Sequence, residues 1–272
     1  PPTPPPAPPP PPKPLEGHGA WKSGHNTRYW DCCKPSCSWP QNTHGAKPVR
    51  QCSKDNHPIT NYNERSGCQG GGAYTCWNQA PFRDENDPGL SFGFVAVPAR
   101  AGASCGSCFE LRYTGDGYYV PQDPGSRKLK GKRMIVQATN IGADVFSGQM
   151  DLMIPGGGTG LFNGCTRQWG NHDLGATYGG FLSKCQNEHG AVCANNGGRL
   201  RCVGVEFPDA QHEEVKKCVR KMCGEIFEGH DELLLACHWF SQWFEAADNP
   251  NFDYRPIDCP EQLVARSGTS RG

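Results

Sequence analysis

Sixteen cysteines in a chain of 272 residues constrain the fold more than any other feature. A high and even number of cysteines is typical of disulfide-bonded chains from oxidising compartments. Zinc binding is the alternative, but only Cys105 and Cys108 have a C-x2-C spacing, and no second pair or H-x3-H follows. The adjacent Cys32 and Cys33 also suit two separate bridges better than one tetrahedral site. We therefore expect a secreted, extracellular protein whose loops are joined by disulfides.

The first 14 residues differ from the rest of the chain, because they contain eleven of its 25 prolines. Such a run adopts extended polyproline II and acts as a semi-rigid spacer. We interpret residues 1–25 as a proline-rich linker with a polar lead-in, connected to an N-terminal module that is missing here. Residues 26–272 are then one domain, long enough to bury a sizeable core.

The net charge is zero, with 27 basic and 27 acidic residues. This balance argues against a protein that holds nucleic acid or an anionic membrane through a positive field. No apolar run approaches the ~18 residues of a membrane span. We expect neither nucleic acid nor membrane among the partners.

The hydrophobic pattern predicts a mainly β domain. Short runs that alternate or are rich in β-branched and aromatic residues are separated by turns of Gly, Pro, Asn and Asp, and they lie at 92–97, 109–113, 133–137 and 150–154. A further strand, apolar on both faces, is predicted at 237–244. One helix is predicted from Asp209, whose apolar stripe consists of Val215, Cys218, Val219, Met222, Cys223 and Ile226. Short strands with long, disulfide-joined loops favour a β-barrel over an α/β sheet.

Several motif matches carry little weight. Residues 102–106 match G-x-S-x-G, but a strand rather than a helix is predicted after them. No H-E-x-x-H is present, and the basic residues at 127–133 are more typical of a solvated turn than of a polyanion site. The Pro155–Gly158 run lacks the Lys-Ser/Thr of a phosphate loop, so a tight turn is expected.

Three aspartates stand in unusual surroundings. Asp31 follows two aromatic residues and precedes two cysteines, whose bridges would fix its backbone. Asp144 lies in a glycine-flanked segment that is able to move. Asp151 lies on a predicted strand between apolar neighbours, where desolvation would raise its pKa. A rigid carboxylate of low pKa and an acid of raised pKa form the pair that glycoside hydrolysis needs. The alternative is that these aspartates are solvated or cap turns.

The same residues resemble a known family. The run TRYWDCCKPSCSW at 27–39 resembles the N-terminal signature of glycoside hydrolase family 45, the small inverting endoglucanases. Further similar stretches lie at 66–68, 108–111, 151–165, 249–250 and 259–266, in the same order. The resemblance covers about residues 26–181 and 232–268. It implies a six-stranded double-psi β-barrel with a long open groove, a monomeric enzyme, and neither metal nor organic cofactor.

The resemblance also implies roles for individual residues. Asp31 would be the general base that activates water, and Asp151 the general acid that protonates the leaving oxygen. Asp144 matches a third acidic residue on a loop that closes over substrate. An inverting pair should stand about 6.5–9.5 Å apart, so we expect Asp31 and Asp151 to face each other across the groove. The implied substrate contacts come from aromatic and polar neighbours, namely Tyr29, Trp30, Lys34, Trp39 and Gln149.

The chain departs from the family pattern in two places. Gln149 stands where the family commonly has His, so tuning by an imidazolium is lost. Residues 182–231 form a long insertion that contains five cysteines and the predicted helix. The resemblance implies four bridges, Cys32–Cys165, Cys33–Cys68, Cys37–Cys105 and Cys52–Cys76, and leaves the pairing within the insertion open.

The implied activity is hydrolysis of internal bonds in cellulose or a related β-1,4-glucan. Expansin-like proteins, which loosen walls without hydrolysis, resemble the same barrel but lack the counterpart of Asp31, whose presence favours an enzyme. A disulfide-rich structural or inhibitory protein is the third possibility. It would bury Tyr29 and Trp30 and leave no groove beside Asp31.

Overall fold

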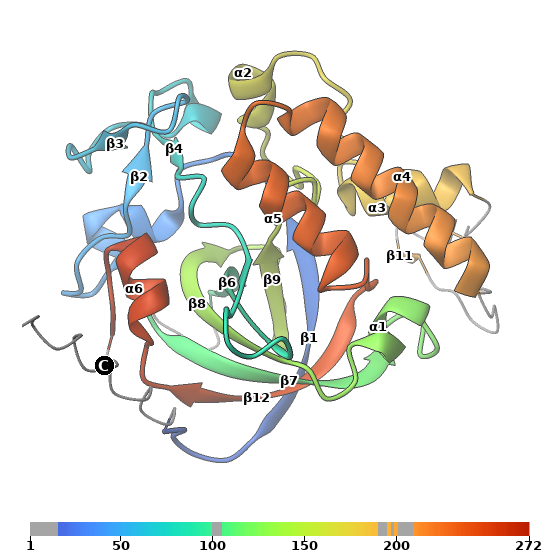
Figure 1. Cartoon of the computed structure of the whole chain (residues 1–272). Helices are drawn as coiled ribbons and strands as arrows, with labels where there is room; N and C mark the ends of the chain where they lie inside the picture. Colours follow the sequence, from blue (N-terminus) through green and yellow to red (C-terminus); the bar gives the residue numbers. More distant parts are fainter. Residues whose placement is uncertain (1–15, 100–104, 190–194, 197–198, 201–208, 272) are drawn as a thin grey trace, which may run out of the picture.

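The computed structural model describes residues 16–99, 105–189, 195–196, 199–200 and 209–271 (Figure 1). The proline-rich run at 1–14, the serine of the G-x-S-x-G match, Cys193 and Cys202 lie outside the described residues. No helix among the described residues is long and apolar enough to cross a membrane.

Six long strands form a closed barrel. In chain order they are β1 (Lys22–Tyr29), β6 (Leu90–Pro98), β7 (Cys108–Gly117), β8 (Arg133–Gly142), β9 (Gln149–Met153) and β12 (Pro250–Ile257). They are hydrogen-bonded in the order β6-β8-β7-β12-β1-β9, and the pairing of β6 with β9 closes the ring. The pairs β1–β9 and β6–β8 are parallel and the other pairs are antiparallel. The predicted six-stranded barrel is confirmed, and β1 begins slightly before the predicted domain start.

The shorter elements surround this barrel. The short strands are β2 (Gln51–Cys52), β3 (Pro58–Ile59), β4 (Tyr74–Thr75), β5 (Phe82–Arg83), β10 (Asn195–Asn196) and β11 (Arg199–Leu200). The helices are α1 (Pro124–Lys128), α2 (Cys165–Trp169), α3 (Gly180–Glu188), α4 (Asp209–Phe227), α5 (Asp231–Gln242) and α6 (Glu261–Ser267). Strands β2, β3 and β4 form a small separate sheet beside the barrel.

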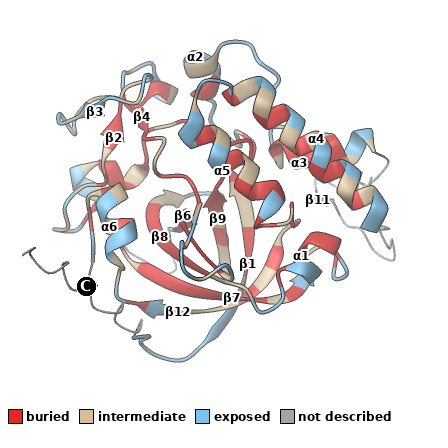
Figure 2. Ribbon diagram, viewed as in Figure 1, coloured by how far each residue is buried: buried red, intermediate tan, exposed pale blue. Residues whose placement is uncertain are grey.

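The barrel interior is the main core (Figure 2). Every residue of β6 is buried, because one face of the strand points into the barrel and the other is covered by neighbouring segments. Gly93 leaves room for the end of the Met134 side chain, because a Cβ atom at this position would lie 2.5 Å from Cε of Met134. The apolar runs at 92–97, 109–113, 133–137 and 150–154, which the sequence predicts as strands, therefore belong to the strands that enclose this interior.

Helix α4 confirms the prediction made from its apolar stripe, whereas the strand predicted at 237–244 is wrong. Residues 231–242 form helix α5, which lies across the barrel in Figure 1. Trp239 donates a hydrogen bond from Nε1 to Oγ of Ser91 in β6, at 3.0 Å. The helix packs between the barrel and α4, so several of its faces are buried, and an aromatic-rich helix buried in this way has the composition of a buried strand.

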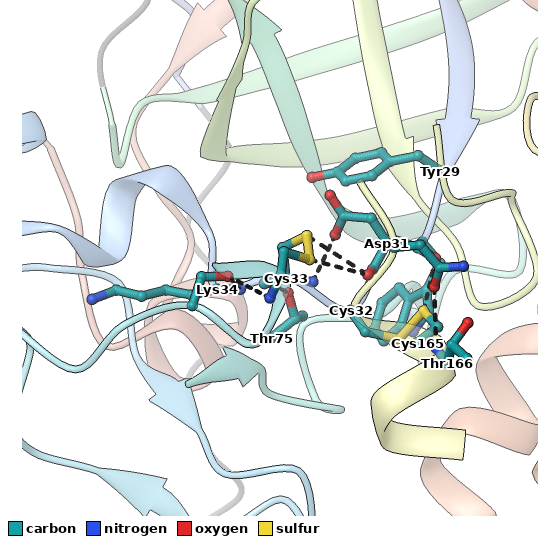
Figure 3. The surroundings of a disulfide bond; sticks show 12 residues. Tyr29, Asp31, Cys32, Cys33, Lys34, Thr75, Cys165 and Thr166 are labelled. Carbon is teal, nitrogen blue, oxygen red and sulfur yellow. Dashed lines mark hydrogen bonds between the residues drawn. A yellow bond between two sulfur atoms is a disulfide. The ribbon is translucent and has the colours of Figure 1, made fainter. Parts of the chain in front are cut away.

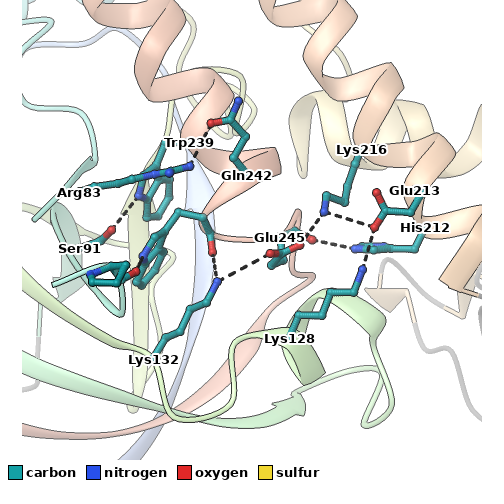
Figure 4. Close-up of polar contacts among 12 residues, drawn as sticks. Arg83, Ser91, Lys128, Lys132, His212, Glu213, Lys216, Trp239, Gln242 and Glu245 are labelled. Carbon is teal, nitrogen blue, oxygen red and sulfur yellow. Dashed lines mark hydrogen bonds and ion pairs between the residues drawn. The ribbon is translucent and has the colours of Figure 1, made fainter. Parts of the chain in front are cut away.

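An ionic network fastens α4 to the barrel (Figure 4). Lys216 of α4 pairs with Glu245 at 2.6 Å, and Lys128 of α1 pairs with Glu213 at 2.7 Å. Nε2 of His212 donates to the backbone carbonyl of Glu245 at 2.7 Å. Most of the basic residues at 127–133 pair with acids, and Arg127, Lys128 and Lys130 remain exposed, in keeping with the solvated turn that we expected.

The structure contains seven disulfides among the described residues. All four bridges implied by the resemblance are present. The remaining three are Cys108–Cys259, Cys185–Cys218 and Cys223–Cys237. The last two hold the insertion together, joining α3 to α4 and α4 to α5.

Candidate active site

Asp31 lies just beyond the end of β1, where the backbone is held from several sides. Trp30 donates its backbone N–H to the carbonyl of Gly158 at 2.7 Å, and the carbonyl of Asp31 accepts from Gly164 at 2.8 Å. The turn at 155–158 is as tight as its sequence predicts: a Cβ atom at Gly157 would lie 2.8 Å from the backbone nitrogen of Tyr29. This glycine turn lets the loop after β9 pack directly on the segment that carries Asp31.

The residue after Asp31 has an unusual backbone. Cys32 has φ of 62°, in the left-handed region that non-glycine residues rarely adopt. Its disulfide to Cys165 and the neighbouring Cys33–Cys68 bridge hold this conformation. As a result the backbone N–H of Cys33 turns back and donates to Oδ1 of Asp31 at 2.9 Å (Figure 3).

Asp151 reaches the same region from β9. The parallel register of β1 and β9 sets Thr27 opposite Asp151, and Thr27 donates from Oγ1 to Oδ1 of Asp151 at 2.7 Å. Gln149 in turn donates from Nε2 to Oγ1 of Thr27 at 2.8 Å. The backbone N–H of Phe146 donates to Oε1 of Gln149, which ties the loop of Asp144 to this chain of hydrogen bonds.

The phenol of Tyr29 lies at the meeting point of all three acids. Burial raises its pKa well above the ordinary value, and the negative charges of Asp31, Asp151 and Asp144 raise it further. Asn140 donates from Nδ2 to its hydroxyl at 3.1 Å. Asp144 itself lies exposed in the loop between β8 and β9. The three aspartates predicted from the sequence therefore converge on one place.

Burial dominates the electrostatics of both inner carboxyls. Desolvation raises the pKa of Asp151 to about 7, against the hydrogen bond from Thr27, and the charges of Asp144 and Asp31 raise it further. The raised pKa predicted for Asp151 is confirmed. Desolvation also raises the pKa of Asp31 to about 7, despite the hydrogen bond from Cys33. The expectation of a low pKa for the rigid carboxylate is thus wrong, because burial outweighs the backbone N–H groups of Cys33 and of Asp31 itself.

Two of the predicted substrate contacts face elsewhere. Trp30 is 5 % exposed and packs in the core, so the structure does not support its contact with a ligand. Tyr29 is buried as well, at 9 % exposed, so the burial expected of a structural or inhibitory protein is present for both residues. Lys34 points away from Asp31 in Figure 3, and its Nζ lies 3.3 Å from the ring centroid of Trp39. Trp39 keeps part of its surface exposed.

The sequence reading missed Thr27 and Asn140. Thr27 could have been found, because it lies two residues before Tyr29 on a strand and so shares its face. Asn140 gave no signal, since its contact with Tyr29 depends on the position of β8. Exposed apolar side chains on the adjoining loops were missed as well: Phe146 lies near Asp144, and Leu161 and Phe162 lie in the loop that leads to Gly164.

The arrangement is suited to proton transfer. Two desolvated carboxyls that share an electrostatic field and have pKa values near 7 favour the state in which one is ionised and the other protonated. Such a pair can donate a proton to one atom while it removes a proton from another. Aromatic rings beside the pair offer flat apolar faces.

Comparison with known proteins agrees with this geometry. The chain is 43% identical to Endoglucanase B of Cellvibrio japonicus over 92% of its length, covering 46% of that protein. It is 37% identical to a putative endoglucanase type K of Fusarium oxysporum, covering 56% of it. The chain thus spans about half the length of these two relatives. It is also 33% identical to an endoglucanase of Cryptopygus antarcticus, covering 88% of it.

A solved structure shares the architecture. The crystal structure of a cellulase from the Antarctic springtail Cryptopygus antarcticus aligns with a TM-score of 0.67 at 33% identity, covering 93% of this chain and 98% of that one. With the closed ring of six strands, this likeness confirms the predicted double-psi β-barrel. The model of glycosyl hydrolase family 45 matches residues 23–222, and the chain therefore belongs to that family.

Proposed function

We propose that this chain is an endo-β-1,4-glucanase that cleaves internal bonds of cellulose or a related β-1,4-glucan by single displacement with inversion. The observation that carries the proposal is the convergence of Asp31 and Asp151 on Tyr29, both with pKa values raised by burial. Membership of a glycosyl hydrolase family and the likeness to endoglucanases support it.

In the proposed mechanism Asp151 is the general acid and Asp31 the general base. Thr27 orients the carboxyl of Asp151 toward the leaving oxygen, and the N–H of Cys33 orients Asp31 toward the attacking water. We expect a separation of about 6.5–9.5 Å between the two carboxyls, which leaves room for that water. Asp144 assists from its exposed loop through its charge. Tyr29, Trp39 and Gln149 line the substrate site, and the glucan is the partner.

The wider setting is proposed on sequence grounds. The disulfides suit an extracellular, secreted protein. The proline-rich run at 1–14 suits a linker to a carbohydrate-binding or docking module. We propose that residues 26–272 act as a monomer.

The test is the substitution Asp151→Asn, assayed by release of reducing ends from carboxymethylcellulose. We expect turnover to fall about 10³-fold or more, because proton donation is lost, while cellohexaose binding stays within about threefold of the wild type. Asp116→Asn, at an exposed position near the end of β7, is the matched control and should keep full activity. Near-normal turnover in Asp151→Asn would refute the acid role.

The stereochemistry is a separate test. Proton NMR of cello-oligosaccharide hydrolysis should detect the α-anomer first, as inversion requires. Initial formation of the β-anomer would exclude single displacement. Filter-paper weakening by the wild type without release of reducing ends would favour the expansin-like alternative.

A further inference from the structure

The ammonium of Lys34 is buried beneath the indole ring of Trp39. Lys34 is only 4 % exposed, and its Nζ lies 3.3 Å from the centroid of that ring. Nζ also donates to the backbone carbonyls of Tyr62 at 2.6 Å and Glu64 at 3.0 Å. An ammonium has three N–H donors, so two carbonyls and one aromatic face account for all of them.

These contacts leave Lys34 no donor for a ligand. Burial lowers the pKa of its ammonium to about 8, against the opposing attraction of the Glu64 carboxylate. A desolvated charge is costly, and it persists only where the surrounding groups compensate for the lost water. Here the compensation comes from the protein itself, which indicates that the role of Lys34 is to hold its neighbours.

What Lys34 holds is the ring of Trp39. The Cys33–Cys68 bridge fixes the backbone just before Lys34, and the Cys37–Cys105 bridge fixes it two residues before Trp39, yet a tryptophan side chain retains two rotatable bonds. A cation against one face restricts the ring, while the ring stays partly exposed to solvent. Carbohydrate binding by a ring that is already oriented avoids the entropic cost of ordering it on contact.

We propose that Lys34 is a positioning residue that acts through Trp39, holding the indole in the orientation in which it stacks on a glucosyl unit. This inference rests on the proposed glucan-binding function. It replaces the sequence-based prediction that Lys34 itself contacts substrate. It also makes Tyr62 and Glu64, which contribute only backbone carbonyls to the contact, part of the support of the site.

A double-mutant cycle tests the proposal. Lys34→Met keeps the length of the side chain but removes the charge, and Trp39→Ala removes the platform. We expect Lys34→Met to raise the Kd for cellohexaose about threefold to tenfold in calorimetry, with kcat changed less than KM. In the Trp39→Ala background the same substitution should have no further effect. Lys34→Arg should recover part of the affinity. Lys54→Met, an exposed lysine in the neighbouring loop, is the control and should bind as the wild type does.

An unchanged Kd in Lys34→Met, or losses that add in the double variant, would overturn the proposal. If Lys34→Met fails to fold, a second measurement decides. The indole N–H signal of Trp39, identified by its loss in Trp39→Phe, should shift between pH 7 and 9 in the wild type as Lys34 loses its proton near pH 8. In Lys34→Arg, whose side chain keeps its charge, it should not shift, and an equal shift in the two proteins contradicts the contact.

The two proposals fail separately. If the wild type binds cellohexaose and the cycle is non-additive, but no reducing ends are released, the catalytic function fails and the role of Lys34 stands. If reducing ends are released while Lys34→Met leaves affinity unaltered, the role of Lys34 fails and the catalytic function stands. If the wild type does not bind cellohexaose, both fail.

Discussion

At the scale of single residues, hydrogen bonds distinguish two carboxyls that burial makes alike. Asp31 and Asp151 both have pKa values near 7, so burial by itself does not assign base and acid. Asp31 accepts from a backbone N–H that a disulfide-held turn fixes in place. Asp151 accepts from a side-chain hydroxyl, which substitution can remove without disturbing the backbone.

Thr27→Val should therefore change the pH dependence of activity. The hydroxyl stabilises the ionised form of Asp151, so its removal raises the pKa of that carboxyl, by about one unit. An acid must be protonated to act, and activity is lost as pH rises through its pKa. The alkaline limb of the kcat/KM profile should thus move to higher pH by about one unit.

Thr27→Ser keeps the hydroxyl and should keep the wild-type profile. If the acidic limb moves to higher pH instead, Asp151 is needed in its ionised form and the roles of acid and base are reversed. An unmoved profile would mean that Thr27 does not tune the carboxyl at all.

At the scale of elements, the insertion is attached to the barrel by buried charge as well as by apolar packing. Lys216 of α4 has a side chain only 11% exposed and pairs with Glu245 in the turn after α5. Glu245 and Ala246 both have positive φ, at 58° and 48°, so this turn depends on its contacts to keep its shape.

Lys216→Met should cost about 1–2 kcal/mol of unfolding free energy, because it removes the shorter of the two lysine contacts of the half-buried Glu245 and leaves only Lys132, at 3.8 Å. Lys217→Met is the matched control on the same helix. Its pair with Glu214 is exposed and screened by solvent, so its loss should leave stability almost unchanged. Urea unfolding with the disulfides intact measures both, and equal losses in the two variants would contradict the importance of the buried pair.

At the scale of the whole molecule, the disulfides divide into those that hold the site and those that hold the insertion. Cys32–Cys165 joins residues 133 apart and lies beside Asp31, whereas Cys185–Cys218 joins residues 33 apart within the insertion. A bridge that closes a longer loop removes more entropy from the unfolded chain. The loop-entropy relation gives a stabilisation of about 5 kcal/mol for Cys32–Cys165 and about 4 kcal/mol for Cys185–Cys218.

Replacing both cysteines of either bridge with serine should lower Tm, but only loss of Cys32–Cys165 should lower kcat. The reason is that this bridge maintains the left-handed backbone of Cys32 and so the direction of the Asp31 carboxyl. Activity on carboxymethylcellulose is to be measured at a temperature where circular dichroism indicates that both variants are folded. An unchanged kcat in the variant that lacks Cys32–Cys165 would show that this bridge matters for stability alone.

Local patterns were sufficient for much of the architecture. Alternation and turn residues predicted four of the six barrel strands, β6, β7, β8 and β9, but not β1 or β12, and the 3.6-residue stripe predicted α4. They failed at α5, because the aromatic run at 237–244 by itself has the composition of a buried strand. The helical spacing shows only over the longer segment, in the buried Leu233, Ala236, Cys237 and Phe240. The carboxylates were found because Asp31 and Asp151 stand in motifs with distinctive neighbours.

The amino-acid sequence by itself determined the cysteine framework, the β class of the domain and the identity of the three acids. Only the tertiary structure decided how those groups behave. It raised the pKa of Asp31, buried Trp30, placed Lys34 under Trp39 and set Thr27 against Asp151. The physical reason is that desolvation and hydrogen bonding of a group depend on which segments, distant in the sequence, pack against it. Local periodicity carries no information about that long-range packing.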